Sequence, residues 1–231
     1  MPNAIVTGAS RGLGLALARA LLRDGHRVVI DGRGAAELDA AARELSALGE
    51  LVAVRGDIAH PEHRRALVEA AGDRIDVVVN NASVLGPSPQ PGLADYPLDA
   101  LERVYRVNVL APLALAQLAL PRMPDGARIV NVTSDAAVEP YPGWGGYGSS
   151  KAALEQLTAI LAAEQPRLRV YAVDPGDMRT RLQQEAFPGE DISDRPPPED
   201  SVPGLLALVA GEPPSGRYRT AELVAGAGAR A

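Results

Sequence analysis

Short apolar segments alternate with longer segments of helical periodicity along nearly the whole chain, beginning at residue 3. The short segments are 3–8, 27–31, 51–56, 75–80, 128–134 and 168–174. They are rich in Val and Ile without polar alternation, which is typical of parallel strands covered on both faces. Between them lie the helical segments 14–25, 35–49, 61–72, 98–120 and 149–165. We therefore predict an α/β fold, a doubly wound, mostly parallel sheet of about seven strands with helices on both faces.

A single domain spanning residues 1–231 accounts for this alternation, because no linker or repeat interrupts it. Two Pro-rich stretches, 85–97 and 187–204, are expected to be long loops. Residues 217–223 are expected to add an edge strand, and residues 225–231 to form a frayed tail.

Composition excludes several classes of protein. The formal charge of −6 argues against a partner that is a nucleic acid or an anionic membrane. The chain has no cysteine, so it has no disulfide and no thiolate metal site. The start lacks a signal-peptide pattern, and no stretch approaches the roughly 18 to 20 apolar residues that span a bilayer. We expect a cytoplasmic protein.

A glycine-rich segment, TGASRGLG at 7–14, directly follows the first strand and opens the first helix. Gly8, Gly12 and Gly14 permit a tight turn and close backbone approach, and the helix start offers free N–H groups to a pyrophosphate. The segment predicts a dinucleotide-binding turn that also includes Ser10, Arg11 and Leu13. A purely structural glycine turn is the alternative.

Further motifs follow in order along the chain: NNAS at 80–83, VNV at 107–109, Ser134, YGSSK at 147–151 and PGDMRT at 175–180. Together with the G-xxx-G-x-G spacing of the glycine turn, they resemble the short-chain dehydrogenase/reductase family. The resemblance covers essentially the whole chain. It implies a Rossmann-like domain that binds a nicotinamide cofactor and catalyses oxidoreduction.

Lys151 is the only lysine, because the other 22 (23 − 1) basic residues are arginine, and it lies four residues after Tyr147. An ammonium about 4 Å from a phenol is worth roughly 4 kcal/mol at an effective dielectric of about 20, or about three pKa units. Positions i and i+4 share a helix face, so both side chains address one ligand. We predict that Tyr147 is the general acid/base and that Lys151 lowers its pKa and holds the ribose. A core tyrosine beside an exposed lysine is the alternative.

Ser134 lies 13 positions before Tyr147, at the carboxyl end of the fifth strand, where doubly wound sheets bind ligands. The resemblance implies that its hydroxyl orients the substrate oxygen; the adjacent Thr133 is not assigned this role. Asn108 is a polar residue inside an apolar helix. The resemblance implies that it holds a water relaying protons to Lys151, and the alternative is a satisfied core asparagine that bridges backbone groups.

The resemblance also implies a set of cofactor-contacting positions on the glycine turn and after the second, third, fourth and sixth strands. They are Gly8, Ser10, Arg11, Gly12, Leu13, Gly14, Arg33, Asp57, Ile58, Asn81, Ala82, Ser83, Tyr147, Lys151, Pro175, Gly176, Met178 and Thr180. Asp57 is placed beside the adenine or, alternatively, caps the next helix. Ser83 stands where the family usually has glycine, and Met178 where it more often has Val or Ile. Thr180 is placed to bind the carboxamide.

The identity of the nicotinamide depends on the end of the second strand, VVIDGRG. Gly32 aligns with the position at which NAD-dependent members carry an Asp, and Arg33 follows it. With Arg11 in the glycine turn, two cations are available to a 2′-phosphate, which favours NADP (NADPH) as cofactor. Asp31 lies one place early, and a one-residue shift would favour NAD instead.

These motifs predict an NADP(H)-dependent oxidoreductase, a ketoreductase that interconverts a carbonyl and a secondary alcohol on a small molecule. A nicotinamide-sensing regulator without turnover, or a cofactor-assisted epimerase or dehydratase, are the alternatives. Residues 187–204 are expected to cover the substrate. Tyr141 and Trp144 either line the substrate pocket or pack locally. The apolar surface of helices 98–120 and 149–165 predicts a homodimer or homotetramer.

The segment HPEH at 60–63 places two histidines three positions apart. Because no strong further ligand accompanies them, we interpret the segment as a solvated helix start rather than a metal site. No metal is expected.

Overall fold

The structure is a computed structural model that describes residues 1–228. One sheet of seven parallel strands, in the order β3-β2-β1-β4-β5-β6-β7, forms its centre. The strands are β1 Asn3–Val6, β2 Arg27–Gly32, β3 Leu51–Arg55, β4 Val77–Asn80, β5 Arg128–Val132, β6 Arg169–Asp174 and β7 Gly216–Arg219. The predicted doubly wound fold is confirmed. The order reverses between β1 and β4, the position at which such sheets bind ligands.

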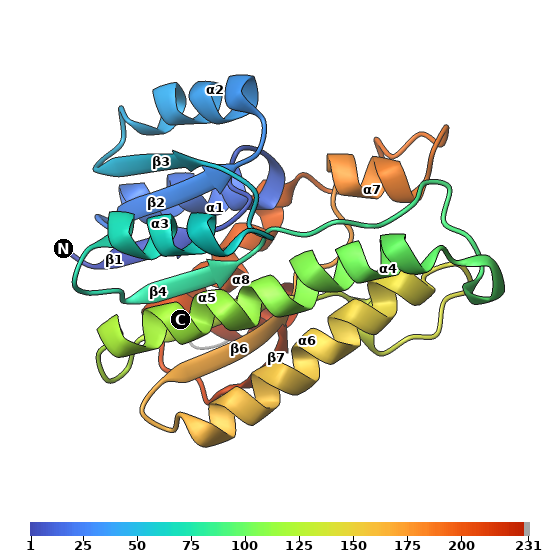
Figure 1. Cartoon of the computed structure of the whole chain (residues 1–231). Coiled ribbons are helices and arrows are strands. Elements are labelled where there is room, and N and C mark those ends of the chain that lie inside the picture. Colours follow the sequence, from blue (N-terminus) through green and yellow to red (C-terminus); the bar gives the residue numbers. More distant parts are fainter. Residues whose placement is uncertain (229–231) are drawn as a thin grey trace.

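Helices cover both faces of the sheet (Figure 1). The α-helices of the described residues are α1 Gly12–Arg23, α2 Ala35–Leu45, α3 Pro61–Ala71, α4 Leu98–Tyr105, α5 Ala111–Ala119, α6 Gly145–Glu164, α7 Arg181–Ala186, α8 Val202–Ala210 and α9 Thr220–Gly228; of these, α7 lies away from the sheet faces (Figure 1). Buried residues of α1, α2 and α8 form the core on one face. Buried residues of α3 and α5, with partly buried residues of α6, form the core on the other face.

Alternation along each strand divides its side chains between the two cores. In β1, Ala4 and Val6 belong to the core beneath α1, whereas Ile5 belongs to the core beneath α3 and α5. Each fully buried aliphatic side chain contributes roughly 1.5–3 kcal/mol to folding, so a strand with both faces covered needs apolar residues throughout. The edge strand β3 departs from the expectation of burial, since Ala53 and Arg55 are exposed.

The segment predicted as one helix over 98–120 contains a turn of π-helix at Arg106–Leu110, between α4 and α5. The combined helix Leu98–Arg122 has the length and apolar character of a membrane span, with a mean hydropathy of 1.3. This corrects the expectation that no stretch comes close to that length. Half of its most apolar 18-residue window is buried inside the protein.

The C-terminal quarter differs from the prediction. The expected loop 187–204 already becomes a 3₁₀ turn at Pro198–Ser201 and then α8, whose proline lies in the first turn where no N–H partner is lost. The strand expected over 217–223 ends at Arg219, and Thr220 begins α9. The predicted frayed tail, 225–231, is helical as far as Gly228, and residues 229–231 lie outside the described part of the chain.

Candidate active site

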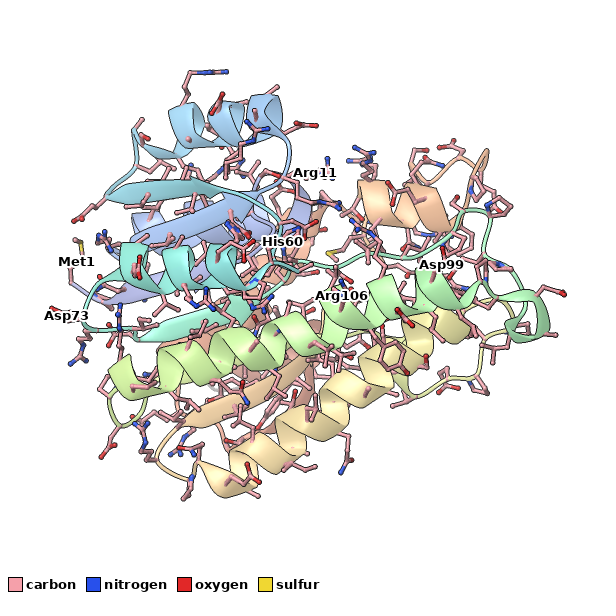
Figure 2. All side chains as sticks on the ribbon, in the orientation of Figure 1. Met1, Arg11, His60, Asp73, Asp99 and Arg106 are labelled. Atoms are coloured by element: carbon pink, nitrogen blue, oxygen red, sulfur yellow. The ribbon has the colours of Figure 1, made fainter. Side chains whose placement is uncertain are left out.

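A cleft with a volume of about 890 Å³ opens at the carboxyl ends of the strands. All residues predicted for the site line this cleft except Gly14 and Asn108. Figure 2 shows Arg11 at the carboxyl ends of the strands, whereas Met1 and Asp73 lie at the amino ends. The topology thus gathers motifs separated by up to about 170 positions along the sequence into one cavity.

The glycine turn has the backbone that its sequence predicts. Gly8 and Gly12 adopt φ angles of 66° and 57°, in the left-handed region that favours glycine. A Cβ at Gly8 would lie 2.8 Å from Ala82 Cα, and a Cβ at Gly14 would lie 2.5 Å from Asn81 Nδ2. The turn is therefore packed directly on the residues that follow β4.

Asn81 and Thr7 hold this contact with hydrogen bonds. Asn81 Nδ2 donates to the carbonyl oxygens of Thr7 at 2.8 Å and Gly8 at 3.2 Å. Thr7 Oγ1 accepts from the backbone nitrogens of Asn81 and Ala82, both at 3.0 Å. The Asn81 side chain thus stabilises the glycine turn, and Asn81 also lines the cleft.

The start of α1 is open toward the cleft. Arg11 occupies the position before the helix, and no side chain caps the first N–H groups there. Uncapped N–H groups carry the positive end of the helix dipole, so this turn fits a phosphate group. The residues present therefore fit the pyrophosphate of a dinucleotide.

Tyr147 and Lys151 share one buried face of α6. Lys151 Nζ lies 5.4 Å from the centre of the Tyr147 ring and donates a hydrogen bond of 2.8 Å to the Val132 carbonyl oxygen. Burial lowers the pKa of Lys151 to about 7, and the Glu155 carboxylate one turn later opposes that shift. The alternative of an exposed lysine beside a core tyrosine is wrong, since Lys151 is buried in the cleft wall.

The pKa of Tyr147 departs from the sequence-based expectation. Burial raises it well above its ordinary value, and the hydroxyls of Ser83 and Ser134 oppose that shift only in part. Two features explain why the expected decrease is absent. The ammonium of Lys151 is itself disfavoured by burial, and the nearby carboxylates of Asp135 and Asp174 raise the tyrosine pKa further.

Ser134 follows β5 and faces the cleft beside Asp135. Its hydroxyl donates to Asp135 Oδ1 at 2.9 Å and accepts from the Ala136 backbone nitrogen at 3.2 Å. The Thr133 hydroxyl donates instead to Glu155 Oε1 at 2.8 Å. Ser134 therefore remains the predicted substrate-orienting hydroxyl. Asp135, which sequence reasoning missed, places a carboxylate beside it.

Asn108 lies in the π-helical turn and is buried. Its Oδ1 accepts from Ser83 Oγ at 3.1 Å and from the Val84 backbone nitrogen at 2.9 Å. Its Nδ2 donates to the Val84 carbonyl oxygen at 2.9 Å and to Ser150 Oγ at 3.0 Å. All four hydrogen-bonding positions of the amide are used, so the side chain is a satisfied core asparagine that bridges backbone groups. A relay water would have to bind another atom of the residue.

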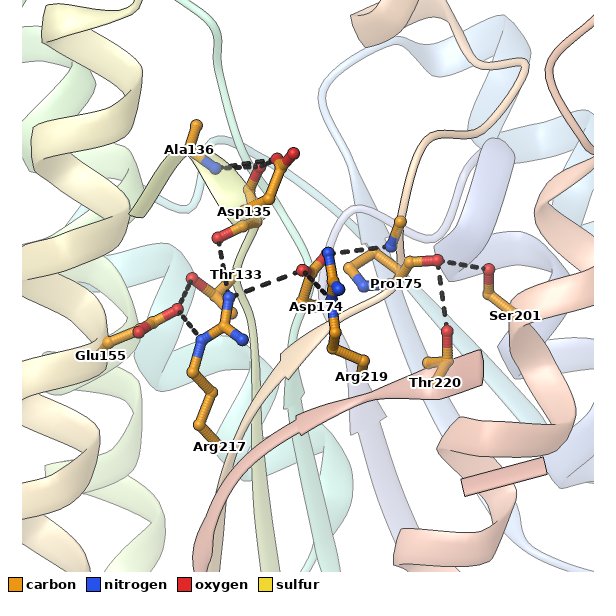
Figure 3. Close-up of polar contacts among 12 residues, drawn as sticks. Thr133, Asp135, Ala136, Glu155, Asp174, Pro175, Ser201, Arg217, Arg219 and Thr220 are labelled. Carbon is orange, nitrogen blue, oxygen red and sulfur yellow. Dashed lines mark hydrogen bonds and ion pairs between the residues drawn. The ribbon is translucent and has the colours of Figure 1, made fainter. Parts of the chain in front are cut away.

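An ionic network beneath Ser134 joins β5, α6, β6 and β7 (Figure 3). Arg217 Nε donates to Glu155 Oε1 at 3.0 Å, and Arg217 Nη2 lies 3.5 Å from Asp174 Oδ2. The same Nη2 donates to the Ser134 carbonyl oxygen at 3.4 Å. Arg219 also approaches Asp174 Oδ2, at 3.4 Å. The only sequence signal for this network is Glu155, which lies four residues after Lys151.

The motif at 175–180, which follows β6, is held by hydrogen bonds from neighbouring segments. Asp174 Oδ1 accepts from the Gly176 backbone nitrogen at 2.9 Å, and Gly176 has a φ of 76°. The Pro175 carbonyl oxygen accepts from Ser201 Oγ and Thr220 Oγ1 (Figure 3). Thr180 caps α7, and its carboxamide contact stays a prediction.

Asp31, at the end of β2, is the residue that would favour NAD if its side chain were free to bind the ribose. Its side chain is buried: Oδ1 accepts from the Gly8 backbone nitrogen at 2.5 Å, and Oδ2 lies 2.8 Å from His63 Nε2. Arg33 is exposed, and Arg11 lies 3.8 Å from Glu37. The description of segment 60–63 as solvated is wrong for His63, because this histidine is buried on Asp31.

Asp57 does not cap α3. Its Oδ1 accepts from the Ala59 backbone nitrogen at 2.9 Å, which stabilises the turn before the helix, and Oδ2 lies 3.6 Å from Arg103. The position before α3 is occupied by His60, which makes no side-chain cap. The alternative of a helix-capping Asp57 is therefore wrong, and its place beside the adenine stays a prediction.

Aromatic residues surround the outer part of the cleft. Trp144 contacts Tyr147, Phe187 and Tyr141, with ring centroids 5.8, 6.0 and 6.4 Å away. All four rings line the cleft. The two alternatives for Tyr141 and Trp144 thus both hold, since the rings pack on one another and also form the cavity wall.

Known proteins are similar to this chain in sequence and architecture. Residues 2–191 match the sequence model of the short chain dehydrogenase family. A rhamnolipids biosynthesis 3-oxoacyl-[acyl-carrier-protein] reductase of Pseudomonas aeruginosa is 35% identical over 191 residues, 78% of this chain and 73% of that protein. A benzil reductase ((S)-benzoin forming) of Saccharomyces cerevisiae is 33% identical over 193 residues, 78% and 73% of the two chains.

Solved structures agree. A short chain dehydrogenase from Shigella flexneri complexed with NADP superimposes with a TM-score of 0.86 at 28% identity, covering 95% of this chain and 97% of that one. The glycine turn, the seven-stranded parallel sheet and the paired Tyr147 and Lys151 are thus set in the fold of a nicotinamide-dependent oxidoreductase. The chain belongs to the short-chain dehydrogenase family.

Proposed function

We propose that this protein is an NADP(H)-dependent oxidoreductase that interconverts a carbonyl and a secondary alcohol. One observation carries the proposal: Ser134, Tyr147 and Lys151 line the same cleft as the glycine turn. A regulator that only senses the cofactor has no need for this group of side chains. In the proposal, residues 1–231 form one catalytic domain, and the segment 187–204 covers the substrate.

Each residue has a chemical role in this proposal. The bound cofactor supplies or accepts the hydride at the substrate carbon. Tyr147 keeps its proton at neutral pH, so it can donate that proton to a carbonyl oxygen during reduction; burial raises its pKa, and the Lys151 ammonium would lower it toward the operating pH. The Ser134 hydroxyl turns its hydrogen from Asp135 Oδ1 to that oxygen and donates a hydrogen bond to it. Lys151 holds the ribose. Glu155 favours the charged form of Lys151, and an anionic group bound nearby would favour that form further.

The choice of NADP(H) rests on the end of β2. Asp31 has a partner on each carboxylate oxygen and its side chain is only 3% exposed, so it is poorly placed to accept from ribose hydroxyls. Arg11 and Arg33 line the cleft and supply the cations that a 2′-phosphate requires. The NADP complex of the Shigella flexneri relative is in keeping with this choice.

The substrate class is suggested by the aromatic wall. Trp144, Phe187 and Tyr141 give the outer cleft a large apolar surface, which favours a carbonyl compound with an aromatic or extended apolar substituent. The benzil reductase relative acts, by its name, on a compound of this type. We also propose a cytoplasmic homo-oligomer that pairs through the α4–α5 and α6 region, where Leu110 and Ile160 are exposed.

The test combines binding and turnover. Purified protein is titrated with NADPH and with NADH by fluorescence, and then supplied with NADPH and a panel of aromatic and aliphatic ketones. We expect tighter binding of NADPH and oxidation of NADPH that depends on a ketone. Binding without turnover on any carbonyl or alcohol would favour the regulator, and binding of neither cofactor would overturn the proposal. Light scattering tests the oligomer, which a monomer would refute.

A further inference from the structure

The buried carboxylate of Asp31 takes no part in the hydride and proton transfer proposed above. Asp31 ends β2 and lines the cleft beside Gly32 and Arg33, yet its side chain is only 3% exposed. A buried carboxylate is costly unless it is paired, and here both oxygens are bound. One of its partners belongs to the glycine turn, and the other is His63 of α3.

The fold builds a specific place for the His63 ring. Gly56, immediately after β3, lies against that ring, and a Cβ at position 56 would be 2.2 Å from His63 Nδ1. The missing side chain at this position therefore creates the space that His63 occupies. His63 is buried with 6% of its side chain exposed, and its Nε2 is 2.8 Å from Asp31 Oδ2. A histidine placed in this way fixes the direction of the carboxylate.

The direction of the Asp31 carboxylate decides which groups of the ligand it can meet. An unrestrained carboxylate at the end of β2 would accept hydrogen bonds from ribose hydroxyls and would repel a 2′-phosphate. Held by His63, Asp31 leaves the adjacent cleft to Arg33 and Arg11. Among the residues that the structure describes, Arg11 pairs with the exposed Glu37, at 3.8 Å, and Arg33 pairs with no carboxylate. The Arg33 guanidinium is thus available to an additional anionic group on the ligand.

We propose that His63 is a specificity-determining residue for the cofactor. It retains Asp31 in the core and so selects a nucleotide with a 2′-phosphate over one with a free 2′-hydroxyl. His63 acts through Asp31 and touches neither substrate nor reacting atoms, so it is a positioning residue. This inference rests on the proposed NADP(H) preference and explains how that preference arises at a strand that ends in Asp-Gly.

The experiment measures the dissociation constants of NADPH and NADH for the wild type, His63→Phe and His63→Ala. Phe keeps an aromatic ring and removes the hydrogen bond, and Ala removes both. We expect the preference for NADPH to fall about tenfold or more in both variants, with NADH binding unchanged or tighter. His60→Ala, on the exposed histidine of the same segment, is the matched control and should keep the wild-type ratio.

Rescue separates the proposal from simple damage to the fold. Asp31→Asn keeps an oxygen for the Gly8 N–H but has no charge, so adding it to His63→Phe should restore the NADPH preference. A damaged fold would weaken both cofactors together and would not be rescued, which would overturn the inference. Unchanged ratios in both His63 variants would also overturn it. A wild type that does not prefer NADPH would instead refute the proposed cofactor itself, before any variant is compared.

Discussion

Lys151 Nζ lies 5.4 Å from the centre of the Tyr147 ring, with both side chains buried on one face of α6. The pair is held in place by the hydrogen bond from Lys151 to the Val132 carbonyl oxygen. Burial shifts the two pKa values apart, upward for Tyr147 and downward for Lys151, so both groups favour their neutral forms. Both side chains also form part of the cleft wall.

Replacing Tyr147 by Phe removes the proposed proton donor without changing the shape of the cleft. We expect turnover to fall by about 10²–10⁴-fold, the usual contribution of general acid–base catalysis. Affinity for NADPH should stay within about twofold, because the ring and Lys151 remain. Steady-state kinetics and fluorescence titration check this, with Tyr105→Phe outside the cleft as the control. Retained turnover in Tyr147→Phe would refute the assignment.

Lys151 makes stability depend on pH. Its pKa is about 7 in the folded protein against an ordinary value of 10.5, so between these values the unfolded chain binds a proton that the folded protein lacks. The free energy of unfolding should therefore rise with pH from about 7 toward 10, by up to about 1.4 kcal/mol per pH unit. Urea unfolding at several pH values measures this slope.

Lys151→Met should remove most of this dependence. Tyr147→Phe should keep it, because the raised tyrosine pKa affects stability only above about pH 10. An identical slope in Lys151→Met and the wild type would contradict the assigned pKa shift.

Arg217 is expected to stabilise the fold through its ionic contacts with Glu155 and Asp174. Its replacement by Leu leaves Glu155, whose side chain is 15% exposed, without its cationic partner, and we expect a loss of about 1–3 kcal/mol in the free energy of unfolding. Arg219→Leu is the matched control. Arg219 is 56% exposed, so its loss should cost less than about 1 kcal/mol. Equal costs for the two variants, by urea unfolding, would argue against the network.

Gly8→Ala should affect both stability and cofactor binding. The φ of 66° is strained for alanine, and the new Cβ would meet Ala82, so we expect a loss of about 1–3 kcal/mol. NADPH affinity should fall about tenfold or more as the turn shifts. Gly25→Ala shares a positive φ of 82° but meets nothing within 4 Å. It should lower the melting temperature and leave the dissociation constant unchanged.

Arg33→Ala and Arg11→Ala test the cations directly. Each should lower NADPH affinity by about 10- to 150-fold, in keeping with the loss of a charge-assisted hydrogen bond worth about 1.5–3 kcal/mol. NADH affinity should change by less than about twofold, because no phosphate contact is lost. Arg23→Ala, at the far end of α1, serves as the control. Equal weakening of both cofactors would show that the arginines do not read the 2′ position.

The order of strands and helices and the positions of the main motifs can be predicted from the sequence alone. Alternating apolar and helical segments predict the doubly wound sheet, because side-chain periodicity reports local geometry directly. The same holds for the glycine turn, whose backbone angles few other residues adopt, and for Tyr147 and Lys151 on one helix face. Each of these signals depends on neighbours within about eight positions.

The remaining features depend on contacts between distant segments. His63 meets Asp31 across 32 positions, and Arg217 meets Glu155 across 62. Neither contact is signalled by local spacing. The pKa values of Tyr147 and Lys151 likewise have signs set by burial, which only the packed fold determines. Local periodicity thus determined which elements form and where the motifs lie. Tertiary packing decided which charges are paired, which are buried and how the site is electrostatically balanced, because solvation and long-range contacts exist only once the chain has folded.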